Sequence, residues 1–313
     1  MRETDKKLER LTQAAKLYYY ENLTQSEIAK RLGVSRPMVS VILSEARALG
    51  IVSITVNEVA NSRQLLERRL KESFGLKEVL LVPEDKNDDR TNSAVAARAF
   101  ELCFPRENSY KSVGVGWGSM LGRMAEYAER LEDSKDGGGR IFPLVGGISS
   151  VVRGYHTNEI VRIFALKTGK EPDFLYIPAL FDSNADLQYT KQTEPYTLIN
   201  AQWDGMEQAI VSISNFPSYP DLAVKTIYGN RLTERRAVGR MLAYYFDAEG
   251  SIISPDADTS LQVSLRQLQR AQVVALCSNQ VKPVCVAGAL RLGLIDTLVL
   301  PYPLAQRVAD LSL

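Results

Sequence analysis

Residues 23–56, LTQSEIAKRLGVSRPMVSVILSEARALGIVSITV, decide how the N-terminal part of the chain folds. Thr24 and Glu27 have the spacing of a capping box, in which the hydroxyl accepts from the amide of Glu27 and the carboxylate accepts from the amide of Thr24. Ala29 is small enough for a close helix crossing, and Gly33 supplies a turn. The pattern predicts a short helix that begins after Thr24 and ends before Gly33.

A second helix is expected directly after this turn. Ser35 is placed to cap it, and Pro37 falls in its first turn, where a missing amide hydrogen bond costs little. Val39 and Ile42 would point back onto the first helix. Two helices joined by a tight glycine turn are typical of the DNA-binding helix-turn-helix. The alternative is a helical hairpin that serves only as a dimer contact.

The outward side chains of this second helix mix hydrogen-bonding and small apolar groups, which suits base edges and thymine methyl groups. Arg47, one turn further along, is better placed for a phosphate. The residues that we expect at the DNA are Thr24, Gln25, Ser35, Arg36, Pro37, Met38, Ser40, Val41, Ser44 and Arg47.

Apolar periodicity predicts a further helix on each side of this motif. The first covers residues 5–20, and its expected apolar stripe is Leu8, Leu11, Ala15 and Tyr18. The second covers residues 61–74, and the side chains expected on its apolar side are Leu65, Leu66, Leu70 and Phe74. It is either a linker or dimerisation helix or a solvated arm. Between the two, residues 51–56 (IVSITV) predict a short β segment, as in a winged helix-turn-helix.

Composition narrows the class of protein. The chain has 313 residues, 45% of them hydrophobic and 24% charged, which predicts a packed core and more than one domain. The charged start MRETDKKLER is unlike a signal peptide, and no apolar run is long enough for a bilayer. Three cysteines without a C-x-x-C pair suggest reduced core thiols, with a metal or redox role as the alternative. We therefore expect a cytoplasmic protein without membrane contact.

Charge is unevenly distributed. Residues 1–57 hold 9 Lys and Arg against 6 Asp and Glu, a balance of +3, whereas the rest of the chain has a balance of −2. A small basic head on a slightly acidic body is compatible with phosphate contact by the head.

From Glu78 onwards apolar β-type runs alternate with helical patterns, which predicts an α/β domain of three layers with ligands at the carboxyl ends of the strands. The expected strands are residues 78–83, 112–117, 140–147, 173–180, 209–214, 272–277 and 297–301. The expected helices are residues 92–102, 119–131, 157–168, 233–245, 282–291 and 303–311.

The best candidate for a ligand site is SVGVGWGSML, residues 112–121. Gly116 and Gly118 would let the backbone approach an anion, and a helix starting near Ser119 would add free amides and a favourable dipole. A simple tight turn is the alternative. The run is not a dinucleotide fingerprint, because Ser119 stands where G-x-G-x-x-G counted from Gly114 needs a glycine.

Other site candidates follow strands or helices further along. Gly147, in the turn that closes 140–147, and Ile148 would lie beside the first loop if the two strands are neighbours. His156, the only histidine, is either a structural residue or a ligand contact. Asp247 and Lys282 are expected either to bind sugar hydroxyls or to be solvated charges.

These pieces, in this order and over nearly the whole chain, resemble the SorC-type family of sugar-responsive transcriptional regulators. The similar segments are residues 23–54, VGVGWGSML, PLVGG, YHTNEIV, YYFDAEG and VKPVCVAGALRLGLIDTLVLP. The resemblance implies a Rossmann-like effector domain similar to sugar-phosphate isomerases, binding phosphorylated sugars in dimers or tetramers. It also implies that Gly116, Trp117, Gly118, Ser119 and Met120 line a phosphate pocket near Gly147 and Ile148, with Asp247 and Lys282 on the sugar.

Two residues depart from the family pattern. Met120 stands where the family commonly has threonine, which removes a hydroxyl donor from the loop and leaves Ser119 to compensate. Val41 stands where an arginine is frequent, so operator contacts at that position are expected to differ.

The function expected from these observations is regulation of a carbohydrate-utilisation operon. Residues 1–57 would bind operator DNA, 58–76 would link or dimerise, and 77–313 would bind a sugar or sugar phosphate, with no cofactor and no metal. The alternative is a sugar-phosphate isomerase or deaminase with an added DNA-binding head. That chemistry needs a general base beside the loop, for which Asp247 is the one acidic candidate the sequence offers.

Overall fold

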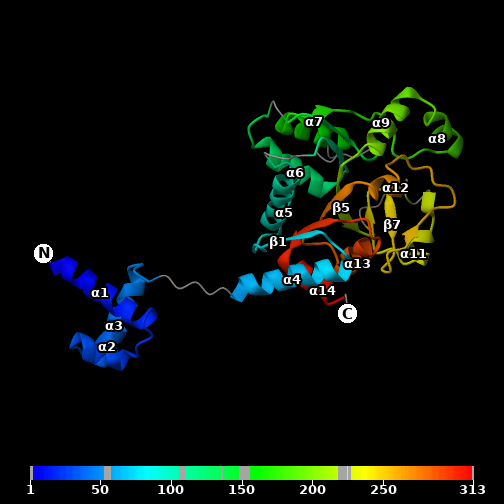
Figure 1. Cartoon of the computed structure of the whole chain (residues 1–313). Helices are drawn as coiled ribbons and strands as arrows, with labels where there is room; N and C mark the ends of the chain where they lie inside the picture. Colours follow the sequence, from blue (N-terminus) through cyan, green and yellow to red (C-terminus); the bar gives the residue numbers. More distant parts are fainter. Residues whose placement is uncertain are drawn as a thin grey trace. The chain divides into compact units, whose positions relative to one another are not determined.

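Three helices form the N-terminal part of the structure: α1 (Glu3–Tyr19), α2 (Gln25–Leu32) and α3 (Arg36–Ala48). The computed structural model describes residues 3–52, 58–105, 110–134, 137–147, 156–217, 224 and 227–311. It divides into two compact units, Met1–Asn61 and Ser62–Leu313, each described by itself below (Figure 1).

Local signals in the sequence correctly placed the helix-turn-helix. The amide of Thr24 donates to Glu27 Oε2 at 2.8 Å, and the amide of Glu27 donates to Thr24 Oγ1 at 3.4 Å, which completes the capping box. Gly33 ends α2 in the left-handed region with φ 65°. Val39 and Ile42 of α3 are buried in the core of this unit. The predicted turn between two packed helices is therefore confirmed.

Three details of this unit differ from expectation. Ser35 occupies the cap position of α3, but its side chain makes no capping hydrogen bond. Leu8 is 50% exposed, whereas Ala14 and Leu17 are buried, because the side of α1 that faces α3 is rotated from the predicted stripe. The predicted wing falls largely outside the described residues. Of it, Ile51 and Val52 lie in a turn and pack against the helices.

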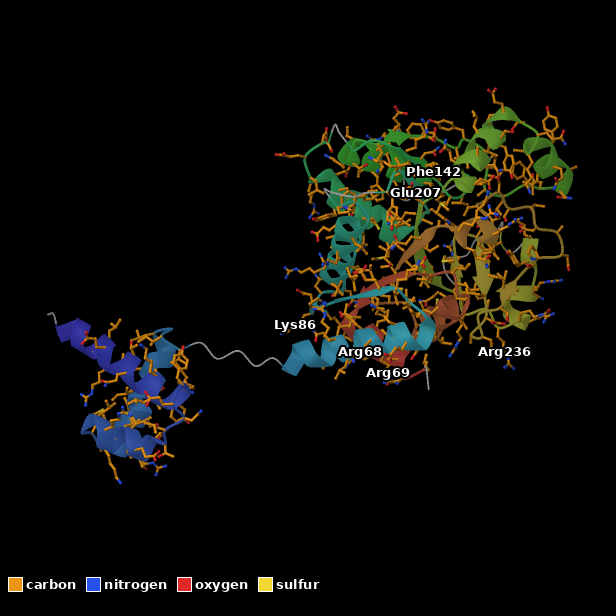
Figure 2. The ribbon with its side chains drawn as sticks, in the orientation of Figure 1. Arg68, Arg69, Lys86, Phe142, Glu207 and Arg236 are labelled. Atoms are coloured by element: carbon orange, nitrogen blue, oxygen red, sulfur yellow. The ribbon has the colours of Figure 1, made fainter. Side chains whose placement is uncertain are left out.

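The helix α4 (Glu58–Phe74) packs on the C-terminal unit, so its described side chains do not form a solvated arm. Leu70 is fully buried there, and the Arg69 guanidinium donates to the carbonyl of Ala309 at 2.6 Å (Figure 2). Leu65 was expected on the buried side, but it is 63% exposed. It is adjacent to Leu66, which packs against the core, and successive side chains point about 100° apart around a helix, so Leu65 lies beyond the edge of the buried face.

A parallel sheet organises the C-terminal unit. Its strand order is β1-β10-β9-β5-β2-β3-β4. The bounds are β1 (Glu78–Val82), β2 (Ser112–Val115), β3 (Arg140–Pro143), β4 (Glu171–Pro172), β5 (Gln208–Asn215), β9 (Gln272–Leu276) and β10 (Thr297–Pro301). The pairs along this path are parallel, and the central strands are apolar on both sides.

Helices cover both faces of the sheet and give the three-layer architecture expected from the sequence (Figure 1). One face is covered by α5 (Asp88–Cys103), α6 (Ser119–Glu129) and α7 (Thr157–Thr168). The other is covered by α4, α9 (Glu194–Asp204), α12 (Leu265–Leu268), α13 (Pro283–Arg291) and α14 (Tyr302–Ala309), and Phe142 of β3 faces it (Figure 2). The remaining named helices are α8 (Asn184–Thr190) and α11 (Arg231–Glu234).

The predicted helix over 233–245 is wrong. In its place the chain forms β6 (Gly239–Met241) and β7 (Tyr244–Phe246), which with β8 (Ile252–Ile253) extend β5 as antiparallel strands. Arg236 has φ 53° and Leu242 has φ 54°, so left-handed residues interrupt any helix at two points. A Cβ on Gly239 would lie 2.2 Å from Cys285 Sγ, so the strand passes very close to α13.

The predicted strand over 173–180 is also wrong. This segment forms only isolated bridges, at Pro178 and Leu180. Phe174 is 39% and Tyr176 is 84% exposed, so the apolar run is not a buried strand. Pro172 and Pro178 lack the amides that a ladder needs, which explains why regular pairing stops here. In the described part of the chain, no helix is both long and apolar enough to cross a membrane.

Candidate effector site and DNA-reading helix

The neighbouring strands β2 and β5 form the topological switch point of the sheet, where the strand order reverses. From β2 it proceeds to β3 and β4, whereas from β5 it proceeds through β9 and β10 towards β1. The loops that follow β2 and β5 therefore diverge, and ligands of open α/β sheets bind in the crevice that such a divergence creates. The glycine loop predicted from the sequence leaves β2 at this point.

Two glycines in this loop are required by its geometry. The amide of Gly116 donates to the carbonyl of Ile210 on β5 at 2.8 Å, and a Cβ on Gly116 would lie 2.9 Å from Leu242 Cδ2. Gly118 has φ 114° and ψ 175°, a conformation that residues with a side chain rarely adopt. The Ser212 hydroxyl donates to the carbonyl of Trp117 at 3.2 Å and holds the loop from below.

The loop ends in an uncapped helix N-terminus. The first helical hydrogen bond of α6 runs from the amide of Gly122 to the carbonyl of Gly118 at 2.9 Å, so the amides of Ser119, Met120 and Leu121 precede it. The cap residue, Gly118, has no side chain with which to occupy those amides. The Met120 side chain is buried in the core, so this residue can offer only its amide, whereas Ser119 is exposed. This terminus is suited to an anion.

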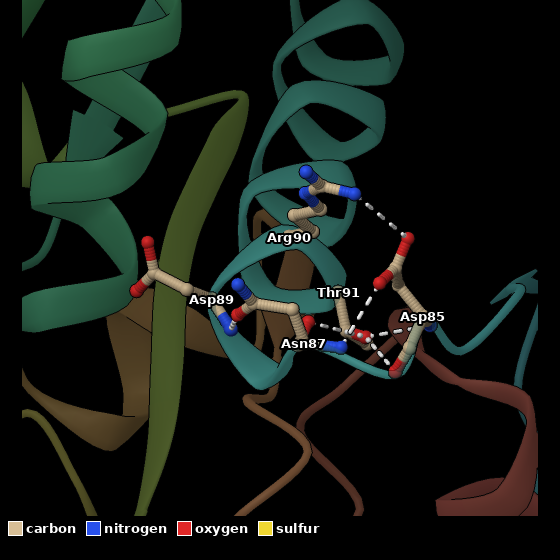
Figure 3. Close-up of polar contacts among 5 residues, drawn as sticks. All are labelled: Asp85, Asn87, Asp89, Arg90 and Thr91. Carbon is tan, nitrogen blue, oxygen red and sulfur yellow. Dashed lines mark hydrogen bonds and ion pairs between the residues drawn. The ribbon is translucent and has the colours of Figure 1, made fainter.

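The helix α5 begins at the same edge of the sheet but is already capped (Figure 3). The Asn87 side chain accepts from the amide of Asp89 at 2.8 Å. Asp85 sits beside this turn, where its amide donates to Thr91 Oγ1 at 2.9 Å. The first turn of α5 also carries Asp88 and Asp89. Capped amides and carboxylates disfavour an anion here, so α6 is the better of the two sites.

Arg240 is a candidate that the sequence did not reveal. It lies on β6, and its guanidinium carbon is 4.4 Å from the centroid of the Trp117 ring. Its Nη1 also donates to the carbonyl of Leu242 at 3.3 Å. Because residues 233–245 were expected to be helical, nothing placed this arginine beside the glycine loop. The one available signal was Gly239, which marks a close backbone approach within an apolar run.

The second glycine turn lies next to the first loop, as expected if their strands were neighbours. β3 pairs with β2, and the amide of Gly147 donates to the carbonyl of Ile177 at 2.7 Å. His156 is the cap residue of α7, the helix that follows β3. Ile148 lies outside the described residues.

Lys282 is held at the end of β5. Its amide donates to Asn215 Oδ1 at 2.8 Å, and it is the exposed cap residue of α13. The connections that follow β2, β3, β5 and β9 thus carry Ser119, Gly147, Arg240 and Lys282, respectively.

Asp247 belongs to a different neighbourhood. Its carboxylate accepts from the amides of Glu249 at 3.1 Å and Ser251 at 2.8 Å, so it closes its own turn. The carbonyl of Asp247 lies 2.5 Å from where a Cβ on Gly288 would be. Gly288 is about 9 Å along α13 from Lys282, at about 1.5 Å per residue. The structure therefore gives Asp247 a turn-forming role and does not place it at the glycine loop.

The outward side of α3 is available to DNA in its own unit. Side chains expected to contact DNA are exposed on it, while Val39, Ile42, Leu43 and Ala46 face inwards. The exposed residues are Ser35, Arg36, Pro37, Met38, Ser40, Val41, Ser44 and Arg47. Two further residues were expected at the DNA near the start of α2. The Thr24 hydroxyl is engaged in the capping box, and Gln25 is half-buried.

A helix-turn-helix joined to a three-layer α/β domain is typical of DNA-binding transcriptional regulators. The family model described as "Putative sugar-binding domain" matches residues 58–308, and the one described as "Sigma-70, region 4" matches residues 9–48. The chain belongs to the SorC-type family of sugar-binding transcriptional regulators.

Relatives match over nearly their whole length. The chain is 26% identical to the sorbitol operon regulator of Klebsiella pneumoniae, covering 92% of this chain and 94% of that protein. It is 26% identical to the deoxyribonucleoside regulator of Bacillus subtilis, covering 95% and 96%. The crystal structure of the full-length sorbitol operon regulator superimposes with a TM-score of 0.70 at 24% identity, covering 96% and 97%. These relatives are transcriptional regulators, and this chain is a regulator rather than an enzyme.

Proposed function

We propose that this protein controls a carbohydrate-utilisation operon and that a sugar or sugar phosphate bound at residues 116–119 sets its affinity for operator DNA. The observation that carries this proposal is the uncapped N-terminus of α6 with the Arg240 cation over the same loop. Free amides, a helix dipole and a guanidinium favour a phosphate or carboxylate. His156 and Lys282 lie around the same edge of the sheet and supply polar groups for the rest of the ligand, and Gly147 lets the backbone of the neighbouring turn approach it.

We propose that the exposed face of α3 is the surface that binds DNA. Arg36 and its neighbours would enter a major groove, and Arg47 would contact a phosphate. We propose that residues 1–57 bind operator DNA and 77–313 bind the effector, joined by 58–76. We also propose that the protein works in the cytoplasm as a dimer or tetramer. A ligand that favours one arrangement of the oligomer would change the spacing of its DNA-reading heads.

The experiment is a thermal-shift screen of the full-length protein with matched pairs of sugars and sugar phosphates. A true effector raises the melting temperature in proportion to the logarithm of its concentration, and at about 100 times its Kd it adds about 2.7 kcal/mol. The phosphorylated member of the productive pair should be the stronger stabiliser. The same compound should then change the mobility shift of DNA from upstream of the gene. Stabilisation without any change in DNA binding would contradict the proposal.

A further inference from the structure

A cavity with a volume of about 160 Å³ lies on the face of the sheet opposite α5, α6 and α7. It shares no residue with the proposed effector site. Its lining residues are Lys191, Tyr196, Asn200, Trp203, Ser260, Leu261, Gln262, Ser264 and Gln267. We propose that this cavity is a separate binding site for a small neutral polyol of four or five carbons. The proposal goes beyond the effector function and does not depend on it.

The polar wall of the cavity is fixed before any ligand arrives. Gln267 is only 8% exposed, and its Oε1 accepts from the amide of Ser264 at 2.9 Å and from the Ser264 hydroxyl at 2.8 Å. Its Nε2 donates to Asn200 Oδ1 at 3.2 Å and to Asp204 Oδ1 at 2.9 Å. A buried amide with both ends satisfied rigidifies its surroundings. The wall is thus preorganised, which lowers the entropic cost of binding.

Two side chains of the lining remain free to bind a ligand. In the described part of the chain, neither the Tyr196 hydroxyl nor the Lys191 ammonium has a hydrogen-bond or ion-pair partner. Burial, with a contribution from Asp204, raises the pKa of Tyr196, so its hydroxyl stays protonated and can both donate and accept. Alternating donors and acceptors of this kind match the hydroxyls of a polyol.

An aromatic corner completes the site. The rings of Tyr196 and Trp203 meet edge to face with centroids 6.3 Å apart, and the Trp203 Nε1 donates to the carbonyl of Pro143 at 2.8 Å. The indole is therefore fixed in orientation. Trp203 is only 2% exposed, so the indole forms the rigid apolar floor of the cavity, while Tyr196 and Lys191 carry the groups that can bind polyol oxygens.

Charge and size define the ligand class. The lining includes one cation, Lys191, and two of its amides, Asn200 and Gln267, donate to the Asp204 carboxylate at 3.3 and 2.9 Å, so the formal charges of Lys191 and Asp204 sum to zero. A volume of about 160 Å³ corresponds to roughly five water molecules at about 30 Å³ each. That space suits a four- or five-carbon polyol and is too small for a disaccharide.

The segment that lines this cavity also supports the second glycine turn. The amide of Gly146 donates to the carbonyl of Leu261 at 3.0 Å, and the amide of Val263 donates to the carbonyl of Leu144 at 2.8 Å. A bound polyol would therefore stabilise the connection that leads from β3 to Gly147.

The test uses isothermal titration of the full-length protein with erythritol and xylitol. A parallel measurement follows tryptophan emission in Trp117→Phe, in which Trp203 is the only remaining tryptophan. We expect saturable binding of at least one polyol, an emission change in Trp117→Phe, and no competition by inorganic phosphate. Tyr196→Phe should weaken binding about tenfold, because it removes one hydrogen bond to the ligand. Tyr189→Phe is the matched control, since this tyrosine is 74% exposed on α8 outside the cavity, and it should bind normally.

Three outcomes would overturn the inference. These are no saturable binding of either polyol, unchanged affinity in Tyr196→Phe, and preferential binding of the anionic sugar acids erythronate or xylonate. Displacement of the polyol by inorganic phosphate would likewise assign it to the loop at residues 116–119. The first three results do not bear on whether that loop binds the effector that controls DNA binding.

Discussion

The guanidinium carbon of Arg240 lies 4.4 Å from the centroid of the Trp117 ring, so a cation from β6 covers the loop that follows β2. A cation over an indole face gains roughly 0.5–2 kcal/mol, depending on how far it is desolvated. The Arg240 guanidinium also donates to the carbonyl of Leu242, and the backbone carbonyl of Trp117 accepts from Ser212, so both the cation and the loop backbone are restrained. The contact positions a fixed positive charge beside the free amides of α6.

The first prediction concerns this charge. Arg240→Ala should weaken binding of the phosphorylated effector about 30-fold, because a hydrogen bond to a charged group contributes about 2 kcal/mol. Arg240→Lys should retain part of the affinity, since the charge remains but the planar stack is lost. The measurement is isothermal titration with a sugar phosphate and its unphosphorylated partner. Arg235→Ala, an exposed arginine at the end of α11, is the control. Equal losses for both ligands would contradict a role in anion recognition.

The position of Arg240 could not be predicted from the sequence, because it depends on contacts between distant segments. The helix-turn-helix was predictable because its signals are local: a capping box spans Thr24 to Glu27, and a single glycine, Gly33, makes the turn. The glycine loop was predictable for the same reason. The strand β6 exists because it pairs with β5 at Ile213 to Asn215, a contact distant in the sequence. The buried residues of 238–246 fit a helical period as well as a hairpin, so periodicity alone could not separate them.

The assignment of Asp247 illustrates the same limit. A carboxylate after an apolar run can either bind a ligand or close its own turn, and the sequence is identical in both cases. The contacts of Oδ1 with the amides of Glu249 and Ser251 establish the turn, and a sugar contact by Asp247 stays a prediction.

The second prediction tests the capping box. Thr24→Ala should destabilise α2 by about 1 kcal/mol, because the amide of Glu27 loses its acceptor. Hydrogen bonds from the Thr24 hydroxyl and amide lower the pKa of Glu27 below its ordinary value of 4.5. The stabilisation is therefore fully present above pH 4.5 and is lost as the pH falls through the lowered native pKa. Hydrogen exchange of α2 amides in the full chain measures both effects. Glu27→Gln should remove the pH dependence, and a persisting acid transition would assign it to another group.

The third prediction concerns the cysteines. Burial raises the pKa of all three thiols, to about 12 for Cys285, so about one in 10,000 Cys285 thiols is ionised at pH 8. An unperturbed thiol with a pKa near 8.5 would be roughly one quarter ionised. In the native protein, the thiols should therefore react with a thiol reagent at pH 8 only as fast as local unfolding exposes them. In the denatured protein, all three thiols per chain should react at once. Rapid modification of one thiol per native chain would show that at least one of Cys103, Cys277 and Cys285 is accessible.

The last prediction separates base reading from phosphate contact on α3. Arg36 lies at the start of the exposed helix face and Arg47 lies three turns further on, near its end. Arg36→Ala should cost about 1–3 kcal/mol on the operator and little on unrelated DNA, because a base-edge contact is lost. Arg47→Ala should weaken both by similar factors and reduce the slope of log K against log salt by about 1, because one released counterion is lost. Mobility shifts over a range of salt concentrations distinguish the two, with Arg98→Ala on α5 as the control. If Arg36→Ala leaves the ratio of specific to non-specific affinity unchanged, α3 does not read the operator through its N-terminal turn.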